Sequence, residues 1–350
     1  MAIDKDMYLA SKIDGQIIPL MKLLAEQPAT IDRTGTGRHK IAGCTLQADN
    51  VGLEYPLLLS KKVFFESLKD ELYWFLRAET NIKGLKSKIW NAWADENGDL
   101  GPIYGAKWMG WEDVKLIFTG LESHEQLYKS LLEQGYTQRG IYPAGDTGYD
   151  EIVMYKKFNQ IEEIEKDLRN RTCSSRNVVN AWDVGDLAQM KLNPCHFAWQ
   201  IVVRTATVQD MAVAQMSMNR GLQKEPYDLT LDIVVYQRSA DVPVGIPFNA
   251  GCYALLLNKF ARVHKYNVGS LSLMLGDTHV YTDQIPFIQQ QEDQWNELQL
   301  SVLRDNELLR YPSVKIHRAD EVNSILDLTA DDIELINYQP KGYVPYPVSV

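Results

Sequence analysis

The chain has 350 residues, of which 45% are hydrophobic and 23% are charged. This is the balance of a globular protein, and it excludes a chain that is disordered throughout. The 36 Lys and Arg residues are outnumbered by 46 Asp and Glu residues, which gives a formal net charge of −10. A protein whose main task is to neutralise a phosphate backbone is normally basic. We therefore expect no nucleic-acid partner.

The N-terminus has no basic stretch followed by an apolar run and a small-residue cleavage site. Nowhere do roughly 18 apolar residues run together, as a membrane span needs. We expect a cytoplasmic protein with no membrane partner. The four cysteines are far apart and form no CxxC pair, which favours reduced thiols over a disulfide framework or a zinc site. We expect no metal.

Hydrophobic periodicity predicts helices and strands in alternation along the chain. Apolar residues at helical spacing predict helices over residues 13–24, 63–77 and about 158–170. Short β-branched or apolar runs predict strands over 178–182, 197–204, 231–237 and 270–275, and the apolar stretch 253–263 predicts a buried helix. Because no regular βαβ count emerges, the pattern favours an α+β fold. We treat residues 1–350 as one domain.

Two stretches interrupt this pattern. Residues 112–156 are rich in Gly, Tyr and charged residues and have mixed periodicity, and residues 209–227 show no clear alternation. We expect both to be insertions that decorate a compact core.

The first chemical signal is Cys195, in the sequence Asn-Pro-Cys-His at 193–196. A cysteine in a turn, beside donors or a guanidinium, can act as a thiolate nucleophile. Taken alone, a cysteine near a strand end is more often a packed small hydrophobe, and His196 is more often a structural histidine.

The second signal is a pair of anion-binding candidates. Arg238 and Ser239 follow an apolar strand in the run Tyr-Gln-Arg-Ser-Ala-Asp at 236–241, and an Arg fork beside a hydroxyl suits a phosphate or a carboxylate. A solvent-facing, salt-bridged Arg would have the same appearance. Arg33 lies in the Gly-rich run DRTGTG at 32–37, which lacks the lysine and the spacing of a P-loop.

The third signal combines aromatic and acidic residues in the segments 71–76, 89–94 and 98–105. Clustered indoles usually mean core packing. They could instead form a platform for a conjugated ring, with Glu71 as a buried carboxyl group.

Seven segments occur together in one order: DRTGTG from 32, ELYWFL from 71, IWNAWADENGDLGPIYG from 89, NPCH from 193, YQRSADVPVGIPFN from 236, LGDTHVY from 275 and YPVSV from 346. In this combination the chain resembles the thymidylate synthase family over most of its length. The resemblance implies a large mixed β-sheet flanked by helices. It also implies transfer of a one-carbon unit from 5,10-methylenetetrahydrofolate to C5 of dUMP, through a cysteine adduct at C6, giving dTMP and dihydrofolate.

The resemblance assigns roles to the catalytic positions. Cys195 would add to C6, with the positive charge of Arg238 beside it. Glu71 would carry protons through ordered water, Tyr104 would assist removal of the C5 proton, and His196 would support the water network. The implied catalytic residues are Cys195, Glu71, Tyr104, His196, Arg238 and Asn249.

Other positions would bind the two substrates. Asn249 would donate to O4 and accept from N3 of uracil, which points to dUMP rather than dCMP. Arg176 matches a phosphate-binding Arg that the family donates from the partner subunit, which implies a homodimer with shared active sites. The implied dUMP-binding residues are Arg33, Arg176, Arg238, Ser239, Asn249, His279 and Tyr281. The implied folate-binding residues are Trp90, Trp93, Leu192, Asp241, Gly245, Phe248 and Val350, the last in a tail that closes over folate.

Some positions depart from the family pattern. Ser175 stands where a second phosphate-binding Arg is usual, for which Arg171 could substitute, and Met109 stands where a basic residue is common. These departures suit an alternative activity, the deoxyuridylate hydroxymethylase of bacteriophage relatives, which gives 5-hydroxymethyl-dUMP and tetrahydrofolate. A catalytically silent nucleotide- or RNA-binding relative would have lost Cys195 or Glu71, and both are present.

Overall fold

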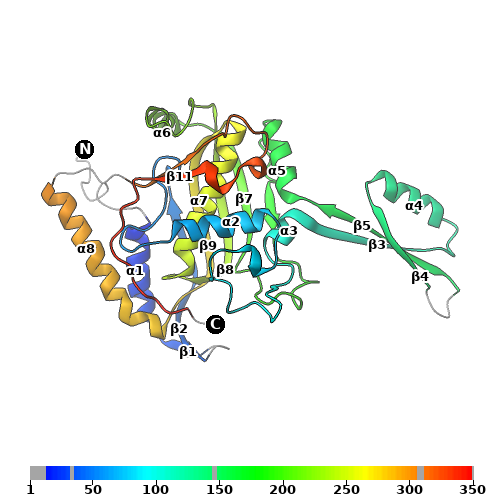
Figure 1. The fold of residues 1–350 in the computed structure, drawn as a ribbon, viewed down its shortest axis with the longest axis horizontal. Coiled ribbons are helices and arrows are strands. Elements are labelled where there is room, and N and C mark those ends of the chain that lie inside the picture. Colours follow the sequence, from blue (N-terminus) through cyan, green and yellow to red (C-terminus); the bar gives the residue numbers. More distant parts are fainter. Residues whose placement is uncertain (1–12, 32–34, 144–147, 306–310, 349–350) are drawn as a thin grey trace.

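The computed structural model describes residues 13–31, 35–143, 148–305 and 311–348. A six-stranded sheet with the order β1-β2-β9-β8-β7-β6 forms its centre (Figure 1). Its strands are β1 (Ala29–Ile31), β2 (Gly37–Ala48), β6 (Val178–Asn180), β7 (His196–Thr205), β8 (Leu229–Asp241) and β9 (Asn267–Tyr281). The β8–β9 pair is parallel and the other pairs are antiparallel. The expectation of an α+β fold with a large mixed sheet is confirmed.

Alternation along the strands decides which face of the sheet is buried. In β8, Leu231, Ile233 and Val235 are fully buried, while the intervening residues are half-buried. The long helix α7 (Gly245–His264) packs on β8 and β9, and α2 (Phe65–Leu76) packs on α7. The buried helix predicted over 253–263 therefore exists and begins earlier than predicted.

The remaining helices surround this core. The helix α1 (Asp14–Ala25) lies beside α8 (Ile288–Asp305) at the edge far from α5 (Gln160–Arg169) (Figure 1). The short elements are α3 (Gly105–Gly110), η2 (Ile82–Gly84), η4 (Thr282–Phe287), η5 (Ile325–Asp327) and η6 (Ala330–Asp332), and β10 (Ser313–Ile316) pairs with β11 (Ile333–Ile336). None of the described helices combines the length and apolarity needed to cross a bilayer.

Sequence periodicity missed two long elements, β2 and α8. The sequence of β2 mixes Gly, basic and small residues with little alternation, and its strand form depends on antiparallel pairing with β9. In the second expected insertion, 209–227, the structure has the helix α6 (Val208–Asn219). Thr207 and Asp210 cap it reciprocally, a signal readable from their three-residue spacing.

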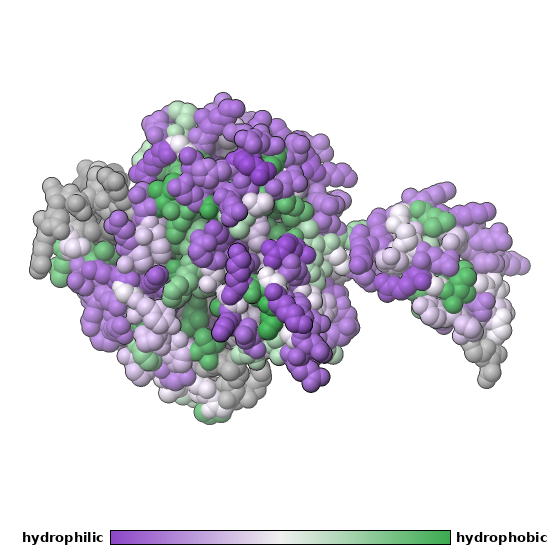
Figure 2. Space-filling view, viewed as in Figure 1, coloured by the Kyte–Doolittle hydropathy of each residue, from purple (hydrophilic) through white to green (hydrophobic). Residues whose placement is uncertain are grey.

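Residues 111–158 form a separate unit that projects from the main body (Figure 1). Its strands β3 (Trp111–Phe118), β4 (Thr137–Pro143) and β5 (Asp150–Phe158) make an antiparallel sheet with β5 in the centre. The helix α4 (His124–Glu133) closes a small core of its own, in which Ile117, Leu131 and Met154 are buried. Hydrophilic residues cover most of the visible surface of this unit (Figure 2). We propose that it is an insertion into a single domain.

Candidate active site

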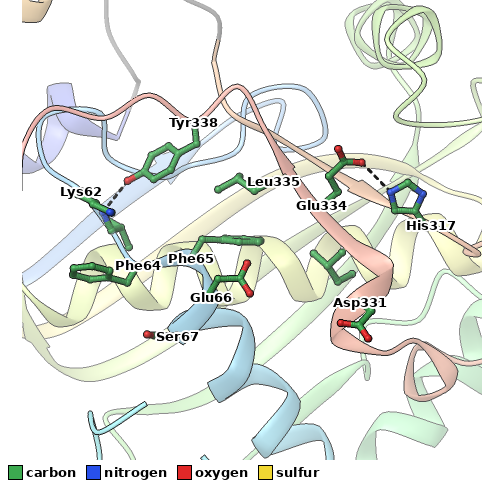
Figure 3. A pocket seen from close by; sticks show the side chains of 12 residues that line it. Lys62, Phe64, Phe65, Glu66, Ser67, His317, Asp331, Glu334, Leu335 and Tyr338 are labelled. Atoms are coloured by element: carbon green, nitrogen blue, oxygen red, sulfur yellow. Dashed lines mark hydrogen bonds and ion pairs between the residues drawn. The ribbon is translucent and has the colours of Figure 1, made fainter. Parts of the chain in front are cut away.

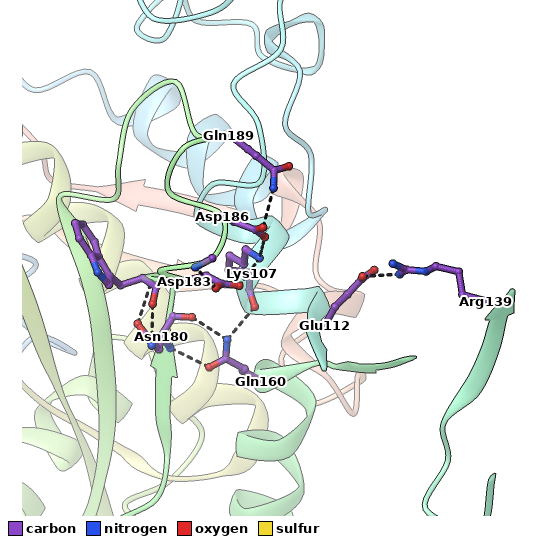
Figure 4. A network of polar contacts seen from close by, with 10 residues as sticks. Lys107, Glu112, Arg139, Gln160, Asn180, Asp183, Asp186 and Gln189 are labelled. Atoms are coloured by element: carbon purple, nitrogen blue, oxygen red, sulfur yellow. Dashed lines mark hydrogen bonds and ion pairs between the residues drawn. The ribbon is translucent and has the colours of Figure 1, made fainter. Parts of the chain in front are cut away.

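A polar network holds α3 against the loop that leads to Cys195 (Figure 4). The Nζ of Lys107 donates to Asp183 at 2.7 Å and also to Asp186. Burial opposes the charge of Lys107, but these hydrogen bonds outweigh it and raise its pKa. Gly101 has φ +75° and passes so close to the carbonyl of Gln189 that a Cβ would overlap it. The two segments therefore meet at a fixed distance, which brings Tyr104 to Cys195.

Hydrogen bonds to Tyr104 and Arg238 hold the Cys195 turn in place. The Cys195 backbone N–H donates to the Tyr104 hydroxyl at 2.9 Å. The Arg238 guanidinium donates to the carbonyls of Pro194 at 2.9 Å and Asn193 at 2.7 Å, and the Arg238 backbone N–H donates to the Cys195 carbonyl at 2.8 Å. The cationic side chain of Arg238 therefore contacts the turn that carries the half-buried Cys195.

Tyr104 occupies an unusual backbone conformation, with φ +34° and ψ −97°. Such conformations cost free energy and tend to occur at functional sites. The next residue, Gly105, lies against the backbone of Phe75 where a Cβ would clash, so α3 can pack directly on α2. The Tyr104 ring stacks on His196 with centroids 4.2 Å apart, and burial raises the Tyr104 pKa well above 10.

His196 and Glu71 are buried titratable groups whose pKa values shift in opposite directions. Burial lowers the pKa of His196 to about 3, and its Nδ1 lies 2.6 Å from the Tyr253 hydroxyl, so this imidazole is neutral near pH 7. Burial raises the pKa of Glu71 to about 7, although a 2.7 Å hydrogen bond from Trp90 Nε1 lowers it. Glu71 can therefore gain or lose a proton near neutrality.

Asn249 lies in the first turns of α7 and donates its Nδ2 to Gln237 Oε1 at 3.1 Å. Gln237 is buried, and its own Nε2 donates to the Ser239 carbonyl at 2.9 Å. Because the second N–H of Asn249 and its Oδ1 do not take part in this bond, the amide keeps one donor and one acceptor for a ligand.

His279 and Tyr281 end β9 on the same side, with ring centroids 5.1 Å apart. The Nδ1 of His279 lies 2.9 Å from the Asp277 carboxylate. Burial lowers the pKa of His279, although Asp277 opposes this shift.

Asp241 ends β8 next to Gly245, the first residue of α7. Desolvation raises the Asp241 pKa to about 7, while a hydrogen bond from Gln284 lowers it. Gln284 is fully buried, and its Nε2 also donates to the carbonyl of Pro347 in the C-terminal tail at 3.1 Å. Further apolar groups flank the site: Trp90 and Trp93 have ring centroids 5.7 Å apart, and Leu192 and Phe248 are half-buried beside the core.

Comparisons with known proteins agree with this geometry. A family model described as thymidylate synthase matches residues 19–350. The chain is 33% identical to a thymidylate synthase of Corynebacterium aurimucosum over 334 residues, which cover 95% of this chain and 96% of that protein. The chain belongs to the thymidylate synthase family. It is accordingly a one-carbon transferase of a family that binds dUMP and uses methylenetetrahydrofolate as co-substrate.

The structure does not place every position matched to the family in this site. Arg176 is exposed beside β6, and Arg33 and Val350 lie outside the described residues. Arg171 pairs with Asp228 and lies over the Tyr266 ring, with 5.0 Å from its guanidinium carbon to the centroid. Arg171 is thus engaged elsewhere and is a poor substitute for the family Arg that Ser175 replaces.

Several contributing residues have no individual signal in the sequence. Gln237 and Gln284 orient Asn249 and Asp241, and Tyr253 faces His196. Lys61 donates to the Pro243 carbonyl at 2.5 Å and lies over the Tyr346 ring. Gln237 and Tyr253 could have been noticed only because they lie inside or beside the family segments.

Other features lie outside this site. A cavity of about 720 Å³ lies where the start of α2 meets β11, lined by apolar side chains and by Glu66, Asp331 and Glu334 (Figure 3). It contains none of the residues discussed above. Among the residues that the structure describes, no three His, Cys, Asp or Glu side chains gather as a metal ion would require.

Proposed function

We propose that the chain is a thymidylate synthase that converts dUMP and 5,10-methylenetetrahydrofolate to dTMP and dihydrofolate, with Cys195 attacking C6 of the uracil ring. The observation that carries this proposal is the Cys195 turn, held between the Arg238 guanidinium and the Tyr104 hydroxyl. A fixed positive charge beside a thiol favours the nucleophilic thiolate.

The nucleotide would lie along the ends of β8 and β9. Arg238 and Ser239 supply a guanidinium and a hydroxyl for the phosphate. Asn249, oriented by Gln237, offers one N–H to O4 and its carbonyl oxygen to the N3–H of uracil. His279 and Tyr281 are neighbouring polar rings suited to the 3′-hydroxyl of the sugar.

Proton transfers would depend on Glu71. Its pKa of about 7 matches the pH at which it has to act, and a general acid or base works best under this condition. Tyr104, whose hydroxyl accepts from the Cys195 N–H, would help to remove the C5 proton. His196 is neutral and would order the water network.

The residues near Asp241 fit a pterin ring. A buried carboxylate accepts from the paired N–H groups of a pterin edge, and the indoles of Trp90 and Trp93 give flat apolar contact. Leu192, Phe248 and Gly245 would complete this surface. Bound methylenetetrahydrofolate supplies the one-carbon unit. The tail that ends in Val350 would exclude water from it.

The second phosphate ligand, Arg176, would come from a partner subunit. Val178 and Met274 are exposed on the outer face of the main sheet, at 43% and 42%, and Tyr236 lies opposite Met274 across the β8–β9 pair. Such an apolar sheet face is suited to self-association. The backbone of Arg176 accepts from the Val178 N–H at 2.7 Å, which fixes Arg176 at the rim of this face.

Identification of the product tests the proposal. Purified protein with dUMP and methylenetetrahydrofolate should show the near-ultraviolet rise that accompanies dihydrofolate formation, and mass spectrometry should find dTMP. We expect this product because Trp90, which donates to Glu71 at 2.7 Å, would pack beside the pterin and would leave little room for an ordered water near the one-carbon unit. Consumption of dUMP without that rise, together with 5-hydroxymethyl-dUMP, would replace the synthase with the hydroxymethylase.

A further inference from the structure

A second cavity, of about 400 Å³, lies beside the last turn of α7. Its walls are residues 221–224 and 227, which follow α6, and residues 315–321, at and after β10. Arg262 in this wall lies 17 residues beyond Gly245 in the same helix. Tyr253, which faces His196, lies nine residues before Arg262 in this helix, so about 14 Å along the helix axis separate Arg262 from the candidate active site. None of the residues proposed above to bind dUMP or folate lines this cavity.

Arg262 carries a buried charge without a matching anion. Its side chain is 5% exposed, and it donates to Gln223 Oε1 and, at 3.4 Å, to the Gly52 carbonyl, both neutral groups. Its Nε is buried and has no hydrogen-bond partner. Within the described ranges, no carboxylate lies within 4.0 Å of this guanidinium. A desolvated cation in this state is costly unless an anion joins it.

Two lysines line the same cavity. Lys315 is half-buried and Lys224 is exposed, and neither has a carboxylate partner within 4.0 Å in the part of the chain that the structure describes. Asp320 also lines the cavity, and its negative charge balances one of the three positive charges of Arg262, Lys224 and Lys315. The unpaired groups therefore leave a surplus of positive charge around Arg262.

The other basic residues of the wall are already paired. Arg318 lies 3.8 Å from Glu321 and 3.5 Å from Asp332. His317 lies 2.9 Å from Glu334, a contact also drawn in Figure 3. The neighbouring cavity has a different charge, because three carboxylates, Glu66, Asp331 and Glu334, line it together with one lysine, Lys62.

The wall is held in place by hydrogen bonds. Gln223 donates its Nε2 to the Glu225 carbonyl at 2.6 Å and to Asn267 Oδ1 at 3.2 Å. The same Asn267 side chain accepts from the Tyr227 N–H at 2.9 Å and donates to the Tyr227 carbonyl at 2.6 Å. The segment 223–227 is thereby fixed to the start of β9, so a ligand would not have to order it.

We propose that this cavity binds a small phosphate-bearing anion, held by Arg262, Lys224 and Lys315. One guanidinium and two ammonium groups match the several oxygens and the multiple charge of a phosphate or diphosphate group. The cavity volume also admits a nucleotide that carries such a group. Because none of the residues proposed to bind dUMP or folate lines this cavity, its ligand would be an effector rather than a substrate.

Calorimetric titration of the full-length protein with pyrophosphate tests the proposal. The protein is first saturated with dUMP, so that phosphate sites in the active centre are filled, and the dUMP titration reports separately on the proposed function. We expect one pyrophosphate per chain. The variants Lys224→Met and Lys315→Met should each weaken binding about fivefold or more, as expected for a lost charge-assisted hydrogen bond. Lys129→Met, an exposed lysine on α4, removes the same charge and should leave binding unchanged.

Further titrations distinguish the sources of the phosphate group. A nucleoside triphosphate that binds more tightly than pyrophosphate would identify a nucleotide effector, and the reverse order would identify a free phosphate anion. Pyrophosphate should raise the melting temperature of the wild-type protein, and Arg262→Met should abolish this rise. Absence of saturable binding by pyrophosphate and triphosphate, or equal weakening by Lys129→Met, would overturn the proposal. If Arg262→Met does not fold, the two lysine variants still test the proposal.

Discussion

Gln284 donates its side-chain amide to both carboxylate oxygens of Asp241, at 3.2 Å each. The same amide nitrogen reaches the carbonyl of Pro347 in the C-terminal tail, and Gln284 Oε1 accepts from the Tyr281 N–H at 2.9 Å. One buried amide therefore joins the proposed folate carboxylate, the proposed sugar-binding strand and the tail.

Gln284→Met should weaken folate use more than dUMP binding. The hydrogen bond from Gln284 lowers the Asp241 pKa, so its loss should raise that pKa above its present value of about 7. The carboxylate would then be ionised only at higher pH. We expect the KM for folate to rise on the order of tenfold at neutral pH and to recover partly at alkaline pH. Gln289→Met, at an exposed position on α8, is the control. A pH-independent effect would contradict this account.

Cys195→Ser should abolish turnover and leave dUMP affinity within about an order of magnitude, since the proposed phosphate and base contacts remain. Cys173→Ser, at an exposed cysteine, should be fully active. Steady-state kinetics and equilibrium dUMP binding measure both. A Cys195→Ser enzyme with a tenth of the wild-type kcat, a loss of about 1.4 kcal/mol, would be too active for a nucleophile.

Glu71→Gln should inactivate the enzyme and stabilise the fold above neutral pH. The Glu71 pKa is raised from 4.5 to about 7, so between these values the folded state holds a proton that the unfolded state has released. Stability from this group is therefore full below pH 4.5 and falls as the pH rises toward 7, by about 3 kcal/mol in total.

Denaturant unfolding at several pH values measures this difference. The variant should gain up to about 3 kcal/mol above pH 7 and nothing below pH 4.5. Glu66→Gln on the same helix, with its side chain 80% exposed, should show no such trend. A Glu71→Gln protein less stable than wild type at pH 8 would show that the carboxylate is favoured in the fold.

Asn249→Asp should reduce selection of dUMP over dCMP. A site that hydrogen-bonds one base edge rejects the other by leaving buried groups unpaired, at a cost on the order of 1–3 kcal/mol. Gln237→Glu keeps the acceptor that orients Asn249 and should retain the preference for dUMP. Competition between the two nucleotides measures the ratio. A wild-type enzyme that already prefers dCMP would refute this account of base selection.

Mixing Cys195→Ser and Arg176→Glu protomers should restore part of the activity lost in each. In a mixed dimer, one of the two shared sites would contain neither lesion. Activity after subunit exchange and the mass in solution by light scattering are the two measurements. A monomer, or no recovery despite demonstrated exchange, would exclude sharing through Arg176.

Local patterns in the sequence were enough to predict several elements of the fold and the chemical groups of the candidate site. The helices α1, α2, α5 and α7 and the strands β7, β8 and β9 follow periodicities that depend on neighbours in the chain. The strand β2 could not be predicted in this way, because its extended form depends on pairing with β9, more than 200 residues away.

Only the tertiary structure decided the environment of each candidate side chain. Glu71 has a pKa near 7 because distant segments bury it and place Trp90 against it, and His196 is neutral for the same reason. Likewise, Gln284 lies far from both Asp241 and Pro347 in the chain, and only folding brings them together. Residue type determines which reactions a group can perform, whereas desolvation and long-range hydrogen bonds determine its protonation and orientation.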